Sequence, residues 1–112
     1  MIQSDPLRMM FERQYFEPSH NVLAIYPTFR MARYEFRIAC DDAPAQITCK
    51  FADMTLVFPQ GNTLRFMVIE NKWDTDRILG YQLVDYFMHN SMWHKPFYDR
   101  LLAILACRVR SK

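Results

Sequence analysis

The chain has 112 residues, of which 51% are hydrophobic, and it carries a net charge of +2. This length and composition predict a single domain over residues 1–112 with a real core, and they exclude a long disordered segment. The charge is too small to indicate nucleic-acid binding by itself.

The apolar segments are too short for a membrane protein. The longest, Leu101 to Cys107, falls far short of the roughly 20 residues that a transmembrane helix needs. The 3 cysteines are odd in number and lack zinc-like spacing, which favours buried free thiols in a reducing compartment. We therefore expect a cytoplasmic protein without membrane contact, and its small size and 8 methionines are compatible with a homodimer.

The first half of the chain predicts a helix followed by strands. Residues 4–16 form the helix, because Ser4 or Asp5 can cap it and Pro6 suits its first turn. Residues 21–26 are either a short strand or a packed loop. Tyr34 to Cys40 is rich in strand formers and predicts a strand.

The middle of the chain predicts a β-hairpin. A long strand runs from Ile47 to Phe58, a second runs from Leu64 to Ile69, and Pro59 to Asn62 form the turn between them. If Phe58 pairs with Thr63, Asp53 lies opposite Val68. A slip of one residue would place Asp53 on the other face of the sheet.

The second half predicts a helix and then a strand. Asp74 or Thr75 can cap a helix from about Asp76 to His89 or Asn90. The run from Leu101 to Cys107 is ambiguous between strand and helix, and we favour a strand because it would follow a helix packed on the sheet.

Three ionisable residues gather at one end of the predicted hairpin. In the assumed register Asp53, Glu70 and Lys72 share a face, and Glu70 is the diagonal neighbour of Asp53, roughly 7–8 Å away. Two carboxylates at that distance can hold a divalent ion through oxygen ligands. The alternative is a solvated sheet edge. Glu12 on the first helix is either solvated or an additional acid of this site.

The motif Asp53, then Glu70-Asn71-Lys72 after a hairpin, resembles the PD-(D/E)XK nuclease superfamily. Gln82 and Tyr86, four residues apart on the predicted next helix, resemble the extra motif of its RecB-like and Rpn/transposase-like branches. The resemblance covers about residues 33–108, and it departs from the family where Ala52 replaces the proline of the family name. It implies an α/β (α+β) fold with a restriction-endonuclease-like αβββαβ core, in which helices flank a central mixed sheet.

The resemblance also implies a function. Asp53 and Glu70, with the backbone carbonyl of Asn71, would bind Mg²⁺ or Mn²⁺, and Lys72 would orient water or stabilise negative charge. Gln82 and Tyr86 would support the lysine or the substrate phosphate. The expected function is metal-dependent hydrolysis of phosphodiester bonds in DNA. The alternatives are a catalytically inactive binding or regulatory module of the same fold, and an unrelated small interaction protein of phage or defence type.

Overall fold

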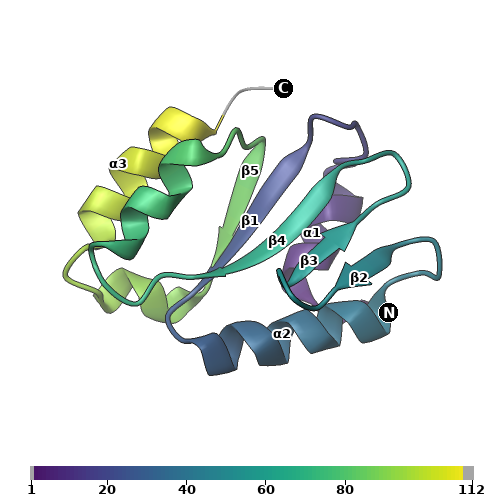
Figure 1. Ribbon diagram of the computed structural model, residues 1–112, viewed down its shortest axis with the longest axis horizontal. Helices are drawn as coiled ribbons and strands as arrows, with labels where there is room; N and C mark the ends of the chain where they lie inside the picture. The colour runs from purple at the N-terminus through teal and green to yellow at the C-terminus, as the bar shows by residue number, and fades with distance from the viewer. Residues whose placement is uncertain (1, 110–112) are drawn as a thin grey trace.

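The computed structural model describes residues 2–109, which form one mixed β-sheet with helices on both faces (Figure 1). The strands lie in the order β2-β3-β4-β1-β5; β1 is parallel to both neighbours and β3 is antiparallel to both. The strands are β1 (Asn21–Tyr26), β2 (Thr48–Lys50), β3 (Thr55–Val57), β4 (Thr63–Val68) and β5 (Asp85–Met88). The helices are α1 (Asp5–Glu12), α2 (Phe29–Asp42) and α3 (Tyr98–Arg108), with 3₁₀ helices η1 (Asp74–Gly80) and η2 (Asn90–His94). The predicted class, a mixed sheet flanked by helices, is confirmed.

The first helix and the central strand follow from local sequence. Ser4 Oγ accepts a hydrogen bond from the backbone N–H of Leu7 at 3.3 Å and thereby caps α1, as predicted. Residues 21–26 form a strand rather than a packed loop, and every residue of β1 after Asn21 is buried. An uninterrupted apolar sequence suits this strand, because neighbouring strands cover both edges and helices cover both faces.

The predicted strand from Tyr34 to Cys40 is wrong, because these residues belong to helix α2. Thr28 caps this helix by accepting the N–H of Met31 at 3.2 Å. The buried residues of the helix follow a helical spacing and are Ala32, Phe36 and Ala39. This helical stripe, packed on the sheet, prevails over the strand preference of the individual residues.

The prediction of one continuous strand from Ile47 to Phe58 is also wrong. It is divided into β2 and β3 by a turn at residues 51–54. Thr55 Oγ1 donates to the carbonyl of Asp53 at 3.1 Å, and Met54 has a positive φ of 48°. A hydrogen bond from a short polar side chain to nearby backbone stabilises such a turn at the expense of a continuous strand.

The second half differs most from the prediction. The helix expected from Asp76 to His89 or Asn90 ends as η1 at Gly80, and the chain then forms β5, which pairs with β1. The strand expected from Leu101 to Cys107 is helix α3. Its buried residues in this region, Leu101 and Leu105, are four apart, and the intervening residues face outward or are half-buried. Burial on one side suits a helix, and Leu and Ala have high helix propensity.

Two cores lie on opposite faces of the sheet. The first joins α1 and α2 to residues such as Ala24 and Phe66, and the second joins η1, η2 and α3 to residues such as Leu23 and Ile25. In Figure 1, α3 lies over the β5 side of the sheet, so β2, β3 and the start of β4 are left open on that face. Within residues 2–109 no helix is both long and apolar enough to cross a membrane.

Candidate functional site

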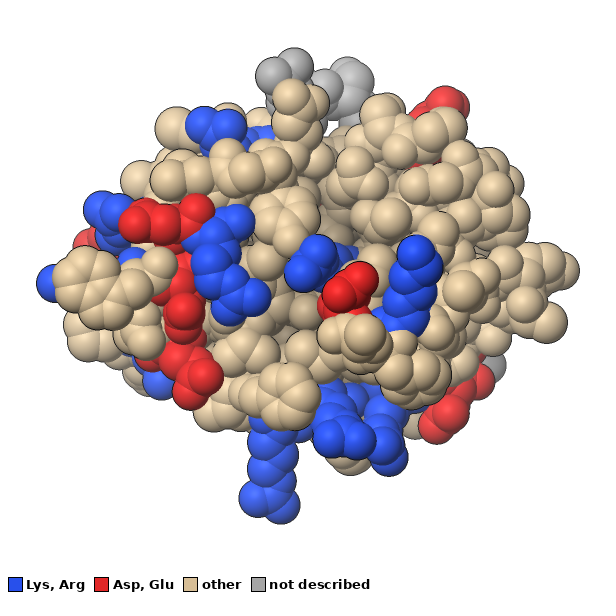
Figure 2. Space-filling view, in the orientation of Figure 1, with Lys and Arg blue, Asp and Glu red and all other residues tan. Residues whose placement is uncertain are grey.

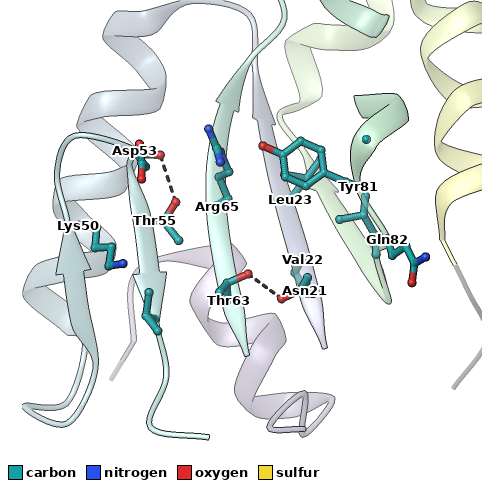
Figure 3. A pocket seen from close by; sticks show the side chains of 13 residues that line it. Asn21, Val22, Leu23, Lys50, Asp53, Thr55, Thr63, Arg65, Tyr81 and Gln82 are labelled. Atoms are coloured by element: carbon teal, nitrogen blue, oxygen red, sulfur yellow. Dashed lines mark hydrogen bonds between the residues drawn. The ribbon is translucent and has the colours of Figure 1, made fainter. Parts of the chain in front are cut away.

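The open half of the sheet carries a row of polar side chains across three strands. Lys50 on β2 pairs with Thr55 on β3, and Thr55 pairs with Arg65 on β4. Directly paired residues point to the same face of a sheet. The three side chains therefore lie in one row, as Figure 3 shows, while the neighbours Leu56 and Leu64 point into the first core.

This row forms the floor of a cavity of about 410 Å³, which we call the trough. Its far wall is the chain from Gly80 to Gln82, and Tyr81 leans over the row (Figure 3). The guanidinium carbon of Arg65 lies 5.5 Å from the centre of the Tyr81 ring, which is a cation–π contact. The ion pairs within residues 2–109 involve Arg8, Arg13 and Arg100, so Lys50 and Arg65 keep unneutralised charges.

A second cavity adjoins the trough and contains the predicted acids. It measures about 310 Å³, and Asp53 and Glu70 both line it. Asp53 comes from the turn between β2 and β3, and Glu70 follows β4. Arg65 and Arg77 line the same cavity, which we call the acid cavity. Two acidic residues and two arginines thus line a cavity that adjoins the trough, and Figure 2 shows acidic and basic side chains side by side over this face.

The β3–β4 hairpin, which positions Asp53 and Glu70, has a strand register other than the predicted one. Thr63 pairs with Val57 rather than with Phe58, so the hairpin register is shifted by one residue. The loop contains three residues, Pro59 to Gly61, because Phe58 N–H donates to the carbonyl of Asn62 at 2.9 Å. Asn62, the residue before β4, is buried, and its side-chain amide donates to the carbonyl of Tyr15, which holds the end of the loop against the N-terminal part of the chain. Asp53 reaches the acid cavity from a turn and not from a strand.

Lys72 lies outside the acid cavity. It is exposed, and its ammonium nitrogen lies 4.5 Å from the centre of the Trp73 ring. It lines a different cavity, of about 480 Å³, together with Phe97, Arg100 and Glu70. Glu70 therefore borders the acid cavity and this other cavity, Asp53 borders the acid cavity and the trough, and Lys72 borders the other cavity.

The remaining predicted residues do not share one element. Gln82 is exposed on the rim of the trough, whereas Tyr86 lies on β5 and packs against the second core. The expected helical Gln-Tyr pair is therefore wrong, since no helix of the described chain contains either residue. Glu12, exposed at the end of α1, belongs to the layer on the opposite face of the sheet (Figure 1) and does not line the acid cavity.

The donors for a metal ion are limited to this pair of carboxylates. Residues 2–109 contain no group of three or more His, Cys, Asp or Glu side chains placed to hold an ion. The backbone N–H of Asp74 donates to both the carbonyl and the side-chain oxygen of Asn71, at 3.1 and 3.2 Å, and the side-chain oxygen also accepts the N–H of Trp73. Mg²⁺ is commonly held by one or two carboxylates together with substrate phosphates. Asp53 and Glu70 fit that mode of binding, in which the ion arrives with a phosphate.

Sequence reasoning missed the basic side chains of the trough. Arg65 alternates with Leu64 and Phe66, which is the signal of a strand with one buried and one open face. Lys50 became a site residue through its pairing with Thr55, and no local sequence signal indicates that pairing.

No protein family, no curated protein and no solved structure matches this chain. The expected kinship with the PD-(D/E)XK superfamily therefore depends on the residues of this chain alone.

Proposed function

We propose that this protein binds nucleic acid, with DNA as the first candidate, along the trough and the acid cavity. The observation that carries the proposal is the row on an open sheet face in which Lys50 and Arg65 have no ion-pair partner among residues 2–109. Arg77 extends this basic surface into the acid cavity. Phosphates are recognised by such groups, and arginine binds them with two parallel hydrogen bonds.

The placement of the charges supports this proposal more than their number does. The net charge is +2, but cations line a concave surface where a phosphate backbone can approach several of them at once. Asp53 and Glu70 lie at one end of this surface and restrict the path of an anionic ligand. The strand is expected to run from the acid cavity along the row towards Lys50.

Binding of a fluorescein-labelled DNA oligonucleotide, followed by fluorescence anisotropy at low salt, tests the proposal. We expect Arg65→Gln to weaken binding about tenfold, since a hydrogen bond to a charged group contributes about 1.5–3 kcal/mol. The matched control is Arg8→Gln, which removes the same charge from α1 on the opposite layer, where Arg8 is paired with Asp5. An equal loss of affinity in both variants would show that binding depends on the net charge alone. Absence of binding by the folded wild-type protein would reject the proposal.

Metal-dependent hydrolysis of the bound strand is the second candidate function. It is favoured by the common cavity of Asp53 and Glu70, which adjoins the trough. From α2 to β5 the chain forms a helix, three strands, the 3₁₀ helix η1 and a strand, and β1 lies between β4 and β5 in the sheet. A bound Mg²⁺ or Mn²⁺ would act as a Lewis acid, and Asp53 and Glu70 would hold it.

Thermal melting with and without Mn²⁺ tests this second function separately from binding. Stabilisation by the ion and DNA cleavage should both disappear in Asp53→Asn and in Glu70→Gln. Lys72→Ala is informative because Lys72 borders the neighbouring cavity: reduced cleavage with retained ion binding would assign it a role with bound substrate. If the wild-type protein binds DNA and cuts neither DNA nor RNA with either ion, the chain is a binding module.

A further inference from the structure

A third pocket continues the acid cavity and differs from it in chemistry. It measures about 310 Å³, lies between α2 and the turn at residues 51–54, and is lined by phenylalanines and arginines. Phe29, Ala52 and Met54 border both this pocket and the acid cavity, so the two adjoin. We call it the aromatic pocket. The acid cavity shares Asp53 and Arg65 with the trough and Phe29 with the aromatic pocket, so the three form a continuous surface that runs from the open sheet face round its end to α2.

Two phenylalanine rings of this pocket are left open to solvent. The exposed fraction is 55% for Phe29 and 64% for Phe51, whereas a phenylalanine side chain is usually buried. Phe51 is nevertheless held in place, because its ring contacts the buried ring of Phe36 edge to face, with centroids 5.3 Å apart and planes at 87°. A rigid exposed ring can stack with a planar ligand at low entropic cost.

Two arginines stand beside these rings. Arg33 and Arg37 follow Phe29 at intervals of four on α2, so the three side chains lie along one face of the helix. Both arginines are exposed, and neither takes part in an ion pair within residues 2–109. Figure 2 shows Lys and Arg side chains gathered along the edge of the molecule where Figure 1 places α2.

We propose that the aromatic pocket binds unpaired bases, so that the preferred ligand of this surface is single-stranded rather than duplex nucleic acid. This inference rests on the proposed function. Open aromatic rings beside a cationic groove are the combination by which single strands are held without sequence preference. Arg33 and Arg37 contact the phosphates, and Phe29 and Phe51 stack with the bases. A duplex presents its phosphates but keeps its base faces stacked inside, and it therefore gains nothing from the two rings.

The test compares three labelled probes of about 10 nucleotides, a length within the range of sites on such surfaces. They are a single-stranded oligonucleotide, its duplex, and an abasic strand with the same phosphates and no bases. We expect the single strand to bind at least about fivefold more tightly than either of the others, since stacking of one base contributes about 1–3 kcal/mol. The acidic polymer polyglutamate serves as a competitor without bases.

Variants of the rings separate stacking from charge. Phe29→Ala and Phe51→Ala should each weaken single-strand binding about fivefold and leave abasic-strand binding unchanged. Phe51→Leu keeps an apolar side chain against Phe36 without an aromatic ring and should bind the single strand as weakly as Phe51→Ala, which separates loss of the ring from loss of packing on Phe36. Tyr34→Ala is the matched control, because Tyr34 is 65% exposed on the same helix and does not line the pocket.

The failure of this inference is distinguishable from the failure of the proposed function. Equal binding of all three probes, weakened by Arg65→Gln and unchanged in the phenylalanine variants, would overturn the inference and leave the proposed function standing. A different outcome is that polyglutamate displaces the single strand at equal charge concentration and itself loses binding in Phe51→Ala. That result would overturn the inference, because it would assign the aromatic pocket to an acidic peptide. Absence of binding by any probe would overturn both.

Discussion

Tyr26 places a hydroxyl group in the first core with no hydrogen-bond partner among residues 2–109. Burial raises its pKa, and the negative charges of Glu35 and Asp5 add to the shift. Below the unfolded-state pKa of about 10 the phenol is protonated in both states and has no effect on the pH dependence. Above it, the unfolded chain releases the proton and the folded protein does not, so stability falls as the pH rises.

Tyr26→Phe removes the unpartnered hydroxyl and keeps the ring, which stacks on Phe66 with centroids 5.7 Å apart. We expect the variant to be more stable than wild type by about 1 kcal/mol at neutral pH, because a buried hydroxyl without a partner is costly. Its stability should also fall less steeply above about pH 10. Urea unfolding at neutral and alkaline pH measures both effects, with the exposed Tyr34→Phe as control. A less stable variant at neutral pH would mean that the hydroxyl has a hydrogen-bonded water.

The expectation of buried thiols is wrong, because Cys107 is exposed and Cys40 and Cys49 are only half-buried. Burial, together with the neighbouring Cys49 thiol, raises the pKa of the half-buried Cys40 to about 12. Because the thiolate is the reactive form, iodoacetamide near pH 8 should modify Cys107 first and Cys40 far more slowly. Peptide mass spectrometry over a time course measures the order. The difference in modification rate between the two thiols should vanish in urea. Early modification of Cys40 in the folded protein would contradict its raised pKa.

At the scale of elements, the hairpin that places the trough depends on Gly61. Its φ of +100° is a conformation that other residues rarely adopt, although an added Cβ would meet only Pro18 Cβ at 3.8 Å. We expect Gly61→Ala to cost about 1 kcal/mol from backbone strain. The matched control is Gly80→Ala, since Gly80 has open space around its Cα and lacks a positive φ. That variant should be neutral or stabilised by about 0.4–1 kcal/mol. Equal effects in thermal melts would contradict this explanation.

Elements with a local signal are predictable from the sequence, and elements that depend on distant partners are not. α1 follows from its cap, and the β3–β4 hairpin follows from its turn residues. β5 has no such signal, because its sequence becomes a strand by pairing with β1, about 60 residues earlier in the chain. The prediction for α3 is wrong because an apolar run of that length does not reveal whether one or two of its faces are buried.

The candidate site, too, is predictable from the sequence only in part. Asp53 and Glu70 line one cavity, but not as strand residues that share a face: the predicted register is wrong by one residue, Asp53 lies in the turn before β3, and Glu70 follows β4. Lys72 does not share that face, because the chain after Glu70 turns away from the strand through hydrogen bonds to Asn71. The aromatic pocket could not be predicted from the sequence. The composition of Tyr34 to Cys40 predicts a strand, whereas Phe29, Arg33 and Arg37 share a face only in a helix.

At the scale of the whole molecule, β1 joins the two cores. Its side chains alternate between them: Val22 and Ala24 belong to the first core, and Leu23 and Ile25 to the second. Disruption of one core should therefore destabilise the other. Trp73 directly precedes η1 and Trp93 lies in η2, the two 3₁₀ helices packed on the second core; both rings are largely exposed, so their fluorescence reports the local order of these two helices.

Leu7→Ala tests this coupling from the first core. Leu7 is fully buried, and its truncation should cost about 2–5 kcal/mol. The urea midpoints read by tryptophan fluorescence and by far-ultraviolet circular dichroism should fall together, as in a two-state transition. An unchanged fluorescence midpoint would show that the second core unfolds independently.

The distribution of charge over the whole molecule predicts how binding depends on salt. Five side chains without an ion pair in the described part of the chain border the continuous surface of trough, acid cavity and aromatic pocket; they are Arg33, Arg37, Lys50, Arg65 and Arg77. If each neutralises one phosphate of a single strand, the logarithm of the binding constant should fall against the logarithm of salt concentration with a slope of about −3.5, since each contact contributes about −0.7.

Each single Arg→Gln or Lys→Gln change at these positions should reduce the steepness of that slope by about 0.7. Arg8→Gln lowers the net charge by the same amount and should leave the slope unchanged, because Arg8 lies on α1 across the sheet. The affinity of a labelled single strand, measured by anisotropy over a series of NaCl concentrations, gives the slopes. A slope near zero, or equal changes in Arg65→Gln and Arg8→Gln, would mean that the phosphates do not follow this surface.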